Sequence, residues 1–596
     1  MRAHPANHKA SDTQPVLGHI ALAVPYQSGL VPVVVSVTGH RHLASEDLGA
    51  IEQAVRAAMI DLQRRCPHSP FWLMSGLAEG ADSIAARCAL ELGWQVHAVM
   101  PVSLEDHESS LSSAQARDAF HTLLSRCASL TILPLSSDAP DQKYLDVAGY
   151  LCQQGQWLIA VWDGKPSEGP GGTADVVRLF EQGMVNAAGT LPDTGPVIHI
   201  SARRQSNDFA SEYVGNRRYR WPNPLNLDPI PKDSGQWWRV LARIDDFNLL
   251  AGHCLDEEAS DIQRHRQSLG FPESDTSFAG SEADRISWIY AVADRLSLRY
   301  QSRRMKSFLW MLCFSLLAIV FEQLYTGPLE NNAFALAFTI LFAALAVYPE
   351  IARRLSRFWG GGGEEAAYLD CRALAEACRV QFYWRINGMA DSTADVFLAE
   401  QRDELEWIRQ ALRSTGMGKA EILLSSNDRF EFALRHWIIE QRKFFVGDGE
   451  HNSRALRNLR KATQYDRIVS VLLSVVLGLL CSAVMIHLIM VTMGIPLTSG
   501  LWLPSVQMGW GVALGAAATV KLYQRTLAYQ ENARRYERMG LLTRVTEISM
   551  TEALSRQSNV IACRDILRSY GCAALRENEH WLTLLRSRPA GSSLSV

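Results

Sequence analysis

The stretch Ile468–Met493 reads IVSVLLSVVLGLLCSAVMIHLIMVTM, and it decides how the second half of this chain folds. Its only ionisable residues are Cys481 and His487. With a rise of about 1.5 Å per residue, a helix of this length can cross a hydrocarbon core of about 30 Å. A soluble helix this long would carry a polar face, and this stretch has none. The sequence therefore predicts a transmembrane helix at this position.

Three more apolar segments have the same character. Residues 501–522 follow the first stretch after a short uncharged turn, GIPLTSG, at residues 494–500. Residues 307–325 and 333–348 form an earlier pair joined by the turn TGPLENN. The two earlier segments lie at the lower edge of the usual spanning length. We expect two helical hairpins and four transmembrane helices.

The basic residues predict how these hairpins are oriented. Neither hairpin turn contains Lys or Arg. Basic residues instead stand before and after each hairpin, at the end of every apolar segment that is farther from the turn: Arg303, Arg304, Lys306, Arg353, Arg354, Arg357, Arg460, Lys461, Arg467, Lys521, Arg525, Arg534 and Arg535. By the positive-inside rule, both turns face outward, and both termini and residues 351–467 stay in the cytoplasm. The sequence thus predicts a multi-pass protein of the inner, cytoplasmic membrane, with the lipid bilayer as a partner.

Composition bounds the remaining possibilities. The 596 residues are enough for two to four domains, and the formal charge of −3 argues against a nucleic-acid partner. The eleven cysteines form no CxxC pair and no Cys/His ligand spacing, so we expect reduced thiols and no metal site. Residues 1–30 hold no continuous apolar core, which predicts a disordered leader and not a signal peptide.

Residues 31–200 alternate between β-branched runs and helical patterns, which predicts an α/β, doubly wound parallel sheet of the Rossmann-like kind. The predicted strands are Val31–Val37, Phe71–Met74, Gln95–Met100, Leu130–Leu135, Gln156–Val161 and Pro196–Ile200. Residues 201–280 open with a stretch rich in Arg, Asn, Pro and Asp and are predicted to be a linker or covering arm. Residues 281–596 are predicted to be an all-α membrane region.

Three turns at predicted strand ends hold the candidate ligand-binding residues. In a parallel sheet such turns share the carboxyl edge, where glycines let the backbone approach a phosphate and helix N-termini favour its charge. The candidates are Gly39, His40, Arg41, Ser75, Gly76, Glu79, Gly80, Asp82, Gly171, Gly172, Thr173 and Asp175. Plainer readings stand beside this one: a single Gly-rich turn is more often only a turn, and acidic residues at a helix start are favoured by the helix dipole.

Residues 74–101, MSGLAEGADSIAARCALELGWQVHAVMP, resemble the core of the SLOG superfamily, which unites the DNA-processing Smf proteins with the Lonely-Guy phosphoribohydrolases. The resemblance covers about residues 31–200 and implies a nucleotide-derived ligand, such as one of the adenosine diphosphate ribose class. In the phosphoribohydrolases a catalytic Glu stands three residues after a Gly-Thr pair. Here Val176 holds that position and Asp175 precedes it. This departure favours binding over hydrolysis, and no catalytic residue is assigned.

The helices that flank the paired spans resemble the SLATT family, two-spanning effector modules joined to SLOG or nucleotidyltransferase sensors. In this chain the hairpin unit occurs twice, which departs from the simplest pattern of that family. The two resemblances together imply a membrane-anchored sensor-effector that assembles as a homo-oligomer and perturbs the bilayer in anti-phage defence. Two alternatives remain open: a membrane-anchored nucleotide or nucleoside hydrolase, and a passive membrane scaffold with a degenerate sensor.

Overall fold

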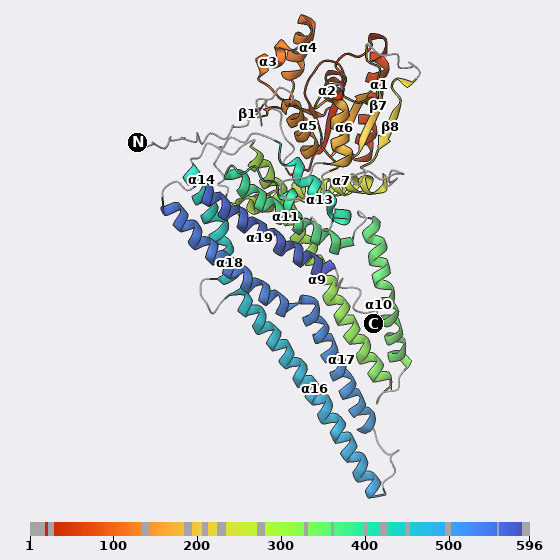
Figure 1. The fold of residues 1–596 in the computed structure, drawn as a ribbon. Helices are drawn as coiled ribbons and strands as arrows, with labels where there is room; N and C mark the ends of the chain where they lie inside the picture. The colour runs from red at the N-terminus through yellow and green to blue at the C-terminus, as the bar shows by residue number, and fades with distance from the viewer. Residues whose placement is uncertain are drawn as a thin grey trace, which may run out of the picture. The chain divides into compact units, whose positions relative to one another are not determined.

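The computed structural model describes most of the chain (Figure 1). The described residues are 18–21, 29–133, 142–167, 169–183, 194–205, 213–222, 234–270, 281–326, 332–358, 363–397, 402–417, 426–447, 453–494, 502–556 and 560–586. Most of the predicted leader and nearly all of both predicted hairpin turns lie outside these residues. The chain divides into two compact units, Met1–Ala293 with Leu374–Leu424, and Asp294–Ala373 with Ser425–Val596.

The first unit contains one mixed sheet, with strands in the order β1-β5-β4-β3-β2-β6-β7-β8. The inner strands are mutually parallel: β2 (Val33–Gly39), β3 (Phe71–Ser75), β4 (Gln95–Met100), β5 (Ser129–Ile132), β6 (Trp157–Trp162) and β7 (Val197–Ser201). These six strands confirm the predicted parallel sheet. Two short edge strands make the sheet mixed, because β1 (Gly18–Ala21) and β8 (Arg217–Arg220) pair antiparallel to their neighbours.

Helices connect the parallel strands and bury the sheet. α1 (Leu48–Arg65) and α2 (Ala81–Glu91) follow β2 and β3, and α1 buries Ile51, Val55, Met59 and Leu62 at helical spacing. α3 (Leu104–Ser109) and α4 (Ala114–Leu124) connect β4 to β5. After β5 the chain returns through α5 (Gln142–Gln154) to β6, and α6 (Thr173–Gln182) leads on to β7. Because crossovers are right-handed, this reversal puts α5 and α6 on the other face of the sheet, where they pack with Val34 and Leu158.

The predicted linker at residues 201–280 contains regular structure. α7 (Ser234–Glu257) and α8 (Ala259–Gln267) fill much of it. The Asn248 side chain of α7 pairs with the Val31 backbone, accepting from its N–H and donating to its carbonyl, each at 2.8 Å. Asp245 of α7 accepts bonds from the Ser69 hydroxyl and the His68 N–H. These bonds attach α7 to the segments just before β2 and β3, and the segment belongs to the α/β unit.

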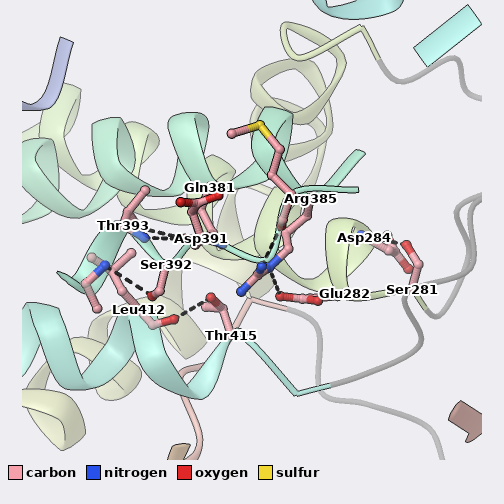
Figure 2. A network of polar contacts seen from close by, with 12 residues as sticks. Ser281, Glu282, Asp284, Gln381, Arg385, Asp391, Ser392, Thr393, Leu412 and Thr415 are labelled. Atoms are coloured by element: carbon pink, nitrogen blue, oxygen red, sulfur yellow. Dashed lines mark hydrogen bonds and ion pairs between the residues drawn. The ribbon is translucent and has the colours of Figure 1, made fainter. Parts of the chain in front are cut away.

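Residues 374–424 also belong to the first unit, which differs from the predicted continuous membrane region. They comprise the second part of α11 (Gly363–Ile386), α12 (Thr393–Val396) and α13 (Arg402–Ser414). Figure 2 shows the polar contacts that fix them to each other and to the start of α9 (Glu282–Thr326). The Gln381 side chain accepts from the N–H and hydroxyl of Thr393 at 2.6 and 2.9 Å. Arg385 donates to the Met389 carbonyl at 2.8 Å and pairs with Glu282.

The second unit is helical in every part that the structure describes. It contains the later part of α9, α10 (Asn332–Phe358), α14 (Ser426–Ala433), the π-helical turn Leu434–Ile439, α15 (Glu440–Val446), α16 (Arg454–Thr492), α17 (Trp502–Leu527), α18 (Tyr529–Ser555) and α19 (Val560–Arg586). α16 and α17 run side by side along their length (Figure 1).

Among the described residues, two helices are long and apolar enough to cross a membrane, α9 and α16, against the four predicted. Their apolar windows are only 17% and 6% buried, whereas the core helix of a soluble protein is mostly buried. The apolar part of α10, Asn332–Val347, is shorter. α17 does not meet these criteria, and many of its positions are glycine or alanine. By length and composition, the structure thus supports two of the four spans.

Glycines bring α17 close to its neighbours. A Cβ atom at Gly511 would lie 2.2 Å from the Gln323 side chain of α9, and one at Gly515 would lie 2.9 Å from Ile319 of α9. A Cβ at Gly509 would touch Leu479 of α16 at 3.2 Å. α17 therefore packs directly against both helices that satisfy the length and hydropathy criteria, as small residues permit between membrane helices.

Candidate functional site

The candidate site lies at the carboxyl ends of β2 and β6. These strands are neighbours, but the chain continues from them toward opposite edges of the sheet. In folds of this class, the strand ends at such a reversal are the usual place for ligands, and we call this place the candidate crevice. A Cβ at Gly39 would lie 2.4 Å from the Ala81 Cβ and 2.6 Å from the Val161 carbonyl oxygen. Only glycine therefore fits at the end of β2.

The loop after β2 and the loop after β3 form one continuous surface. The N–H of Ala81, the first residue of α2, donates to the His40 carbonyl at 3.1 Å. Gly80 has a φ of +80°, and a Cβ there would lie 2.4 Å from the carbonyl oxygens of His40 and Arg41. The tertiary structure thus brings together two of the three predicted turns, with Arg41 exposed at their junction.

A buried ionic cluster supports this crevice. Asp163, which directly follows β6, has a fully buried side chain; one of its carboxylate oxygens lies 3.1 Å from His40 Nε2 and the other 3.1 Å from Arg204 Nε. Burial acts to raise the pKa of Asp163, but the Lys165 N–H, His40 and the Arg204 guanidinium outweigh it and hold the pKa below its ordinary value. His40 is therefore a buried, bonded residue and not a solvated one.

Arg41 extends from the β2 loop toward α5. Its guanidinium carbon lies 6.0 Å from the ring centre of Tyr144, and Lys143 Nζ lies 5.2 Å from the same ring. Gly171, from the third predicted turn, packs on the Tyr144 backbone; its φ is +74°, and a Cβ there would lie 2.6 Å from the Tyr144 carbonyl carbon. Tyr144 therefore links the first and third turns, and two cations gather above its ring.

Asp82 lies beneath this surface on the first turn of α2. Its Oδ2 lies beside Gly76, 3.0 Å from the position that a Cβ atom of residue 76 would take. The N–H groups of Ala78 and Gly76 donate hydrogen bonds to the Asp82 carboxylate. Burial raises the pKa of Asp82 to about 7, although Arg41 and the two N–H groups act in the opposite direction. Burial also lowers the pKa of His107 on α3, and the positive charge of Arg41 adds to this effect. Near neutral pH the Asp82 carboxyl group in the candidate crevice is thus divided between its protonated and its ionised form.

Several predicted residues have local structural roles. Glu79 accepts from the Ser112 N–H at 3.1 Å and from its hydroxyl at 2.6 Å, which joins the β3 loop to the segment before α4. Asp175 accepts from the Gly171 N–H at 3.1 Å and from Arg178 at 2.7 Å. The Ser75 hydroxyl accepts from the Leu77 N–H at 3.1 Å, and Leu77 has a positive φ of 50°.

Two predicted residues stand where α6 begins. Gly172 is the N-cap residue of α6, and Thr173 is its first residue. Helix N-termini present free N–H groups, which suits an anion at this position.

The sequence reasoning missed Asp163, Arg204, His107, Lys143 and Tyr144. Asp163 carried the same signal as His40, since it directly follows a buried strand at the carboxyl edge. Arg204 stands three residues beyond β7. Lys143, Tyr144 and His107 lie on helices whose docking no local pattern specifies, so sequence spacing offered no signal for them.

Two cavities lie away from this crevice. One, of about 450 Å³, is lined by Leu255, Ile262 and Trp288; the other, of about 710 Å³, includes Phe71, Trp94 and Arg126 near the amino ends of β3 and β4. We place the candidate site at the carboxyl edge because the charges and close backbone approaches meet there. Within the described part of the chain, no group of three or more His, Cys, Asp or Glu residues is arranged to hold a metal ion.

Comparison with known proteins adds no assignment. No family model matches the chain, and no curated protein matches it significantly.

Proposed function

We propose that this protein is a membrane-anchored sensor-effector whose α/β unit binds a phosphate-bearing, nucleotide-derived ligand at the carboxyl edge of its sheet. The observation that carries the proposal is the convergence of Arg41, Lys143 and the N-terminus of α6 around Tyr144. The positive groups complement a phosphate or diphosphate, whereas the glycines of these turns serve to pack the loops on one another. The resemblance to SLOG domains implies a nucleotide-derived ligand, such as one of the adenosine diphosphate ribose class.

The helical unit is the proposed effector, with four spans. α9 and α16 satisfy the length and hydropathy criteria by themselves, and α17 packs against both through its glycines. If α9 and α16 cross the bilayer, α17 lies in it as well. α10 presents the exposed apolar side chains of Leu336, Ile340 and Phe342, and its Phe334 ring stacks on Phe321 of α9. The flanking basic residues support an orientation in which both termini lie in the cytoplasm of an inner-membrane protein.

The resemblance to SLATT modules supports a proposal for what the helical unit does in the cell. A homo-oligomer of such helical units would perturb or permeabilise the bilayer once the ligand is bound, as part of anti-phage defence. A ligand shifts such an equilibrium only if it binds one state better than the other.

The test of sensing uses the full chain in detergent micelles and a panel of ADP-ribose, nucleoside diphosphates and inorganic diphosphate, with thermal unfolding as the readout. At least one phosphate compound should raise the unfolding temperature. The Arg41→Gln variant should bind it at least about tenfold more weakly, since a hydrogen bond to a charged group contributes about 1.5–3 kcal/mol. Arg117→Gln, on the exposed surface of α4, is the matched control and should bind like the wild type.

Unchanged affinity in Arg41→Gln would place the ligand outside the crevice. No stabilisation by any compound in the panel would argue for the passive scaffold.

A second candidate function is hydrolysis of a nucleotide or nucleoside. The raised pKa of Asp82 favours it, because a carboxyl group with a pKa of about 7 can exchange a proton at neutral pH. Glu79 and Asp175, the other candidate carboxylates, are already bonded to Ser112 and Gly171. Release of free base or ribose phosphate by the wild type, abolished in Asp82→Asn, would establish the enzyme. Ligand binding without any released product would support sensing.

A further inference from the structure

A basic collar lies on three helices of the helical unit, where their apolar surface begins. We give this name to six exposed residues on α9, α16 and α17: Arg303, Lys306, Arg460, Lys461, Arg467 and Arg525. Distant parts of the sequence contribute to it, so the collar exists only in the folded unit.

Contacts between the helices place these residues at one level. Lys521 of α17 pairs with Asp466 of α16 at 2.8 Å, and the Gln524 amide donates to the Ala462 carbonyl at 3.1 Å. Phe308 of α9 stacks on Tyr523 of α17, with ring centres 6.3 Å apart. The collar residues lie within a few positions of these contacts on each helix.

The collar carries a strong excess of positive charge. In the segments 301–312, 460–470 and 519–527 there are eight Lys or Arg residues, and the sole carboxylate, Asp466, is paired with Lys521. The side chains immediately beyond the collar are apolar and exposed, for example Trp310 at 64% and Val471 at 58%. The positively charged residues thus lie directly next to the exposed apolar surface.

Tyrosines mark the same level. The Tyr465 ring lies 5.5 Å from that of Tyr523 and 5.6 Å from that of Tyr529, and the latter pair is stacked. Tyrosine prefers the boundary between hydrocarbon and water, because its ring is apolar and its hydroxyl polar. Charge, tyrosines and the start of the apolar surface therefore coincide at one level of the helical unit.

We infer that the basic collar is a binding surface for anionic phospholipids, whose phosphates it contacts at the headgroup level of one leaflet. This rests on the proposed membrane placement of the helical unit. Guanidinium groups bind phosphate oxygens in bidentate geometry, which suits the four arginines of the collar. Zwitterionic headgroups offer no net negative charge to the collar, so they bind it more weakly.

The experiment measures thermal unfolding of the full chain in micelles doped with phosphatidylglycerol or with phosphatidylcholine. Phosphatidylglycerol should stabilise the protein at lower doping, and added salt should weaken its effect, since screening acts on exposed charges. In the variant Arg460→Gln/Arg467→Gln/Arg525→Gln, the half-effective fraction of phosphatidylglycerol should rise at least about tenfold. The control Arg435→Gln/Arg556→Gln/Arg568→Gln removes three exposed arginines outside the collar and should respond like the wild type.

Two results would overturn the inference: equal stabilisation by both lipids in the wild type, or an unchanged response in the collar variant. Equal stabilisation by free glycerol phosphate would also overturn it, because that would indicate a site for soluble anions. The wild-type comparison of lipids and salt stands even if the collar variant does not fold. Resistance to alkaline extraction from cell membranes tests insertion separately, so loss of lipid preference with intact insertion contradicts the collar and not the membrane proposal.

Discussion

Asp82 and Gly80 are close neighbours in the candidate crevice, but each meets a different physical demand. Position 80 requires glycine for two reasons. Its φ is positive, and the carbonyl oxygens of His40 and Arg41 occupy the space that a Cβ atom would need. Asp82 is an acidic side chain held where burial opposes its charge. The first constraint concerns backbone geometry and the second concerns solvation, and each predicts a different kind of experiment.

For Asp82, we predict a stability that depends on pH. The pKa rises from an ordinary 3.8 to about 7 on folding, so the folded chain binds more protons than the unfolded chain between these values. Stability attributable to Asp82 should therefore be full below pH 3.8 and decline as pH rises through 7. Asp82→Asn should gain up to about 4 kcal/mol relative to the wild type at pH 8, with little gain at pH 4. Denaturant unfolding at the two pH values measures this, and an equal effect at both would contradict the raised pKa.

For Gly80, a second glycine provides a matched control. Gly93 has nearly the same φ, +79° against +80°, but nothing lies within 4 Å of its Cβ position. Gly93→Ala should cost about 1–2 kcal/mol, from the left-handed backbone alone. Gly80→Ala adds a steric conflict with two carbonyl groups and should cost at least about 2 kcal/mol more. Denaturant unfolding compares the two variants, and equal losses would show that the two loops are not packed as described.

At the scale of single elements, the glycines of α17 determine how the helical unit packs. A Cβ at Gly515 meets Ile319 of α9 at 2.9 Å, whereas a Cβ at Gly478 of α16 meets nothing within 4 Å. Gly515→Leu should destabilise the unit by about 1–3 kcal/mol, the usual cost of overpacking. Gly478→Leu introduces the same side chain without a conflict and should leave thermal unfolding in micelles unchanged. If Gly478→Leu destabilises the protein as much as Gly515→Leu does, the α16 surface around Gly478 is in contact with another helix in the assembled protein.

α9 is the element that connects sensing to response in the proposed function. It is one continuous helix from Glu282 to Thr326, and its first turns are fixed in the α/β unit by the Glu282–Arg385 pair and by Arg285, which lies 4.7 Å above the Trp72 ring. A ligand with a hundredfold preference for one state supplies about 2.7 kcal/mol to shift the equilibrium. A continuous helix can carry such a shift along its axis.

We predict that inserting four glycines after Arg299 uncouples the two functions. Ligand affinity should remain nearly that of the wild type, while ligand-dependent leakage of dye from liposomes disappears, because glycine breaks helical continuity. Four inserted alanines keep the helix continuous and serve as the control. Leakage that persists with the glycine insertion, or that never depends on ligand, would contradict coupling through α9.

At the scale of the whole molecule, the basic flanks predict one topology. In a variant with Cys313 and Cys481 replaced by serine, single cysteines at positions 331 and 498 should react with a membrane-impermeant thiol reagent in intact cells. A cysteine at position 400 should react only after lysis. The remaining native cysteines, which are buried except for the half-buried Cys572, set the background and are measured in the parent variant. Labelling at position 400 in intact cells would contradict the proposed orientation, in which residues 351–467 lie in the cytoplasm.

Much of the fold could be predicted because local patterns specify it. Buried strands such as the one predicted at Gln156–Val161 appear as largely apolar runs, and the structure places β6 at Trp157–Trp162. α16 was evident from its unbroken apolar stretch, which nothing but a membrane span or a buried helix can use. The predicted turns fell at the carboxyl ends of real strands because alternating strands and helices already imply a parallel sheet.

Tertiary structure alone decided the rest, because it depends on contacts between residues distant in sequence. Residues 374–424 joined the α/β unit through contacts such as that of Gln156 with the Gln410 carbonyl, at 3.0 Å. His40 became part of a buried cluster because β6 and the segment after β7 bring Asp163 and Arg204 beside it. The basic collar likewise requires three helices to bring their basic residues to one level. Sequence by itself determined which segments avoid water and where the chain turns, whereas packing determined which of those segments and turns meet.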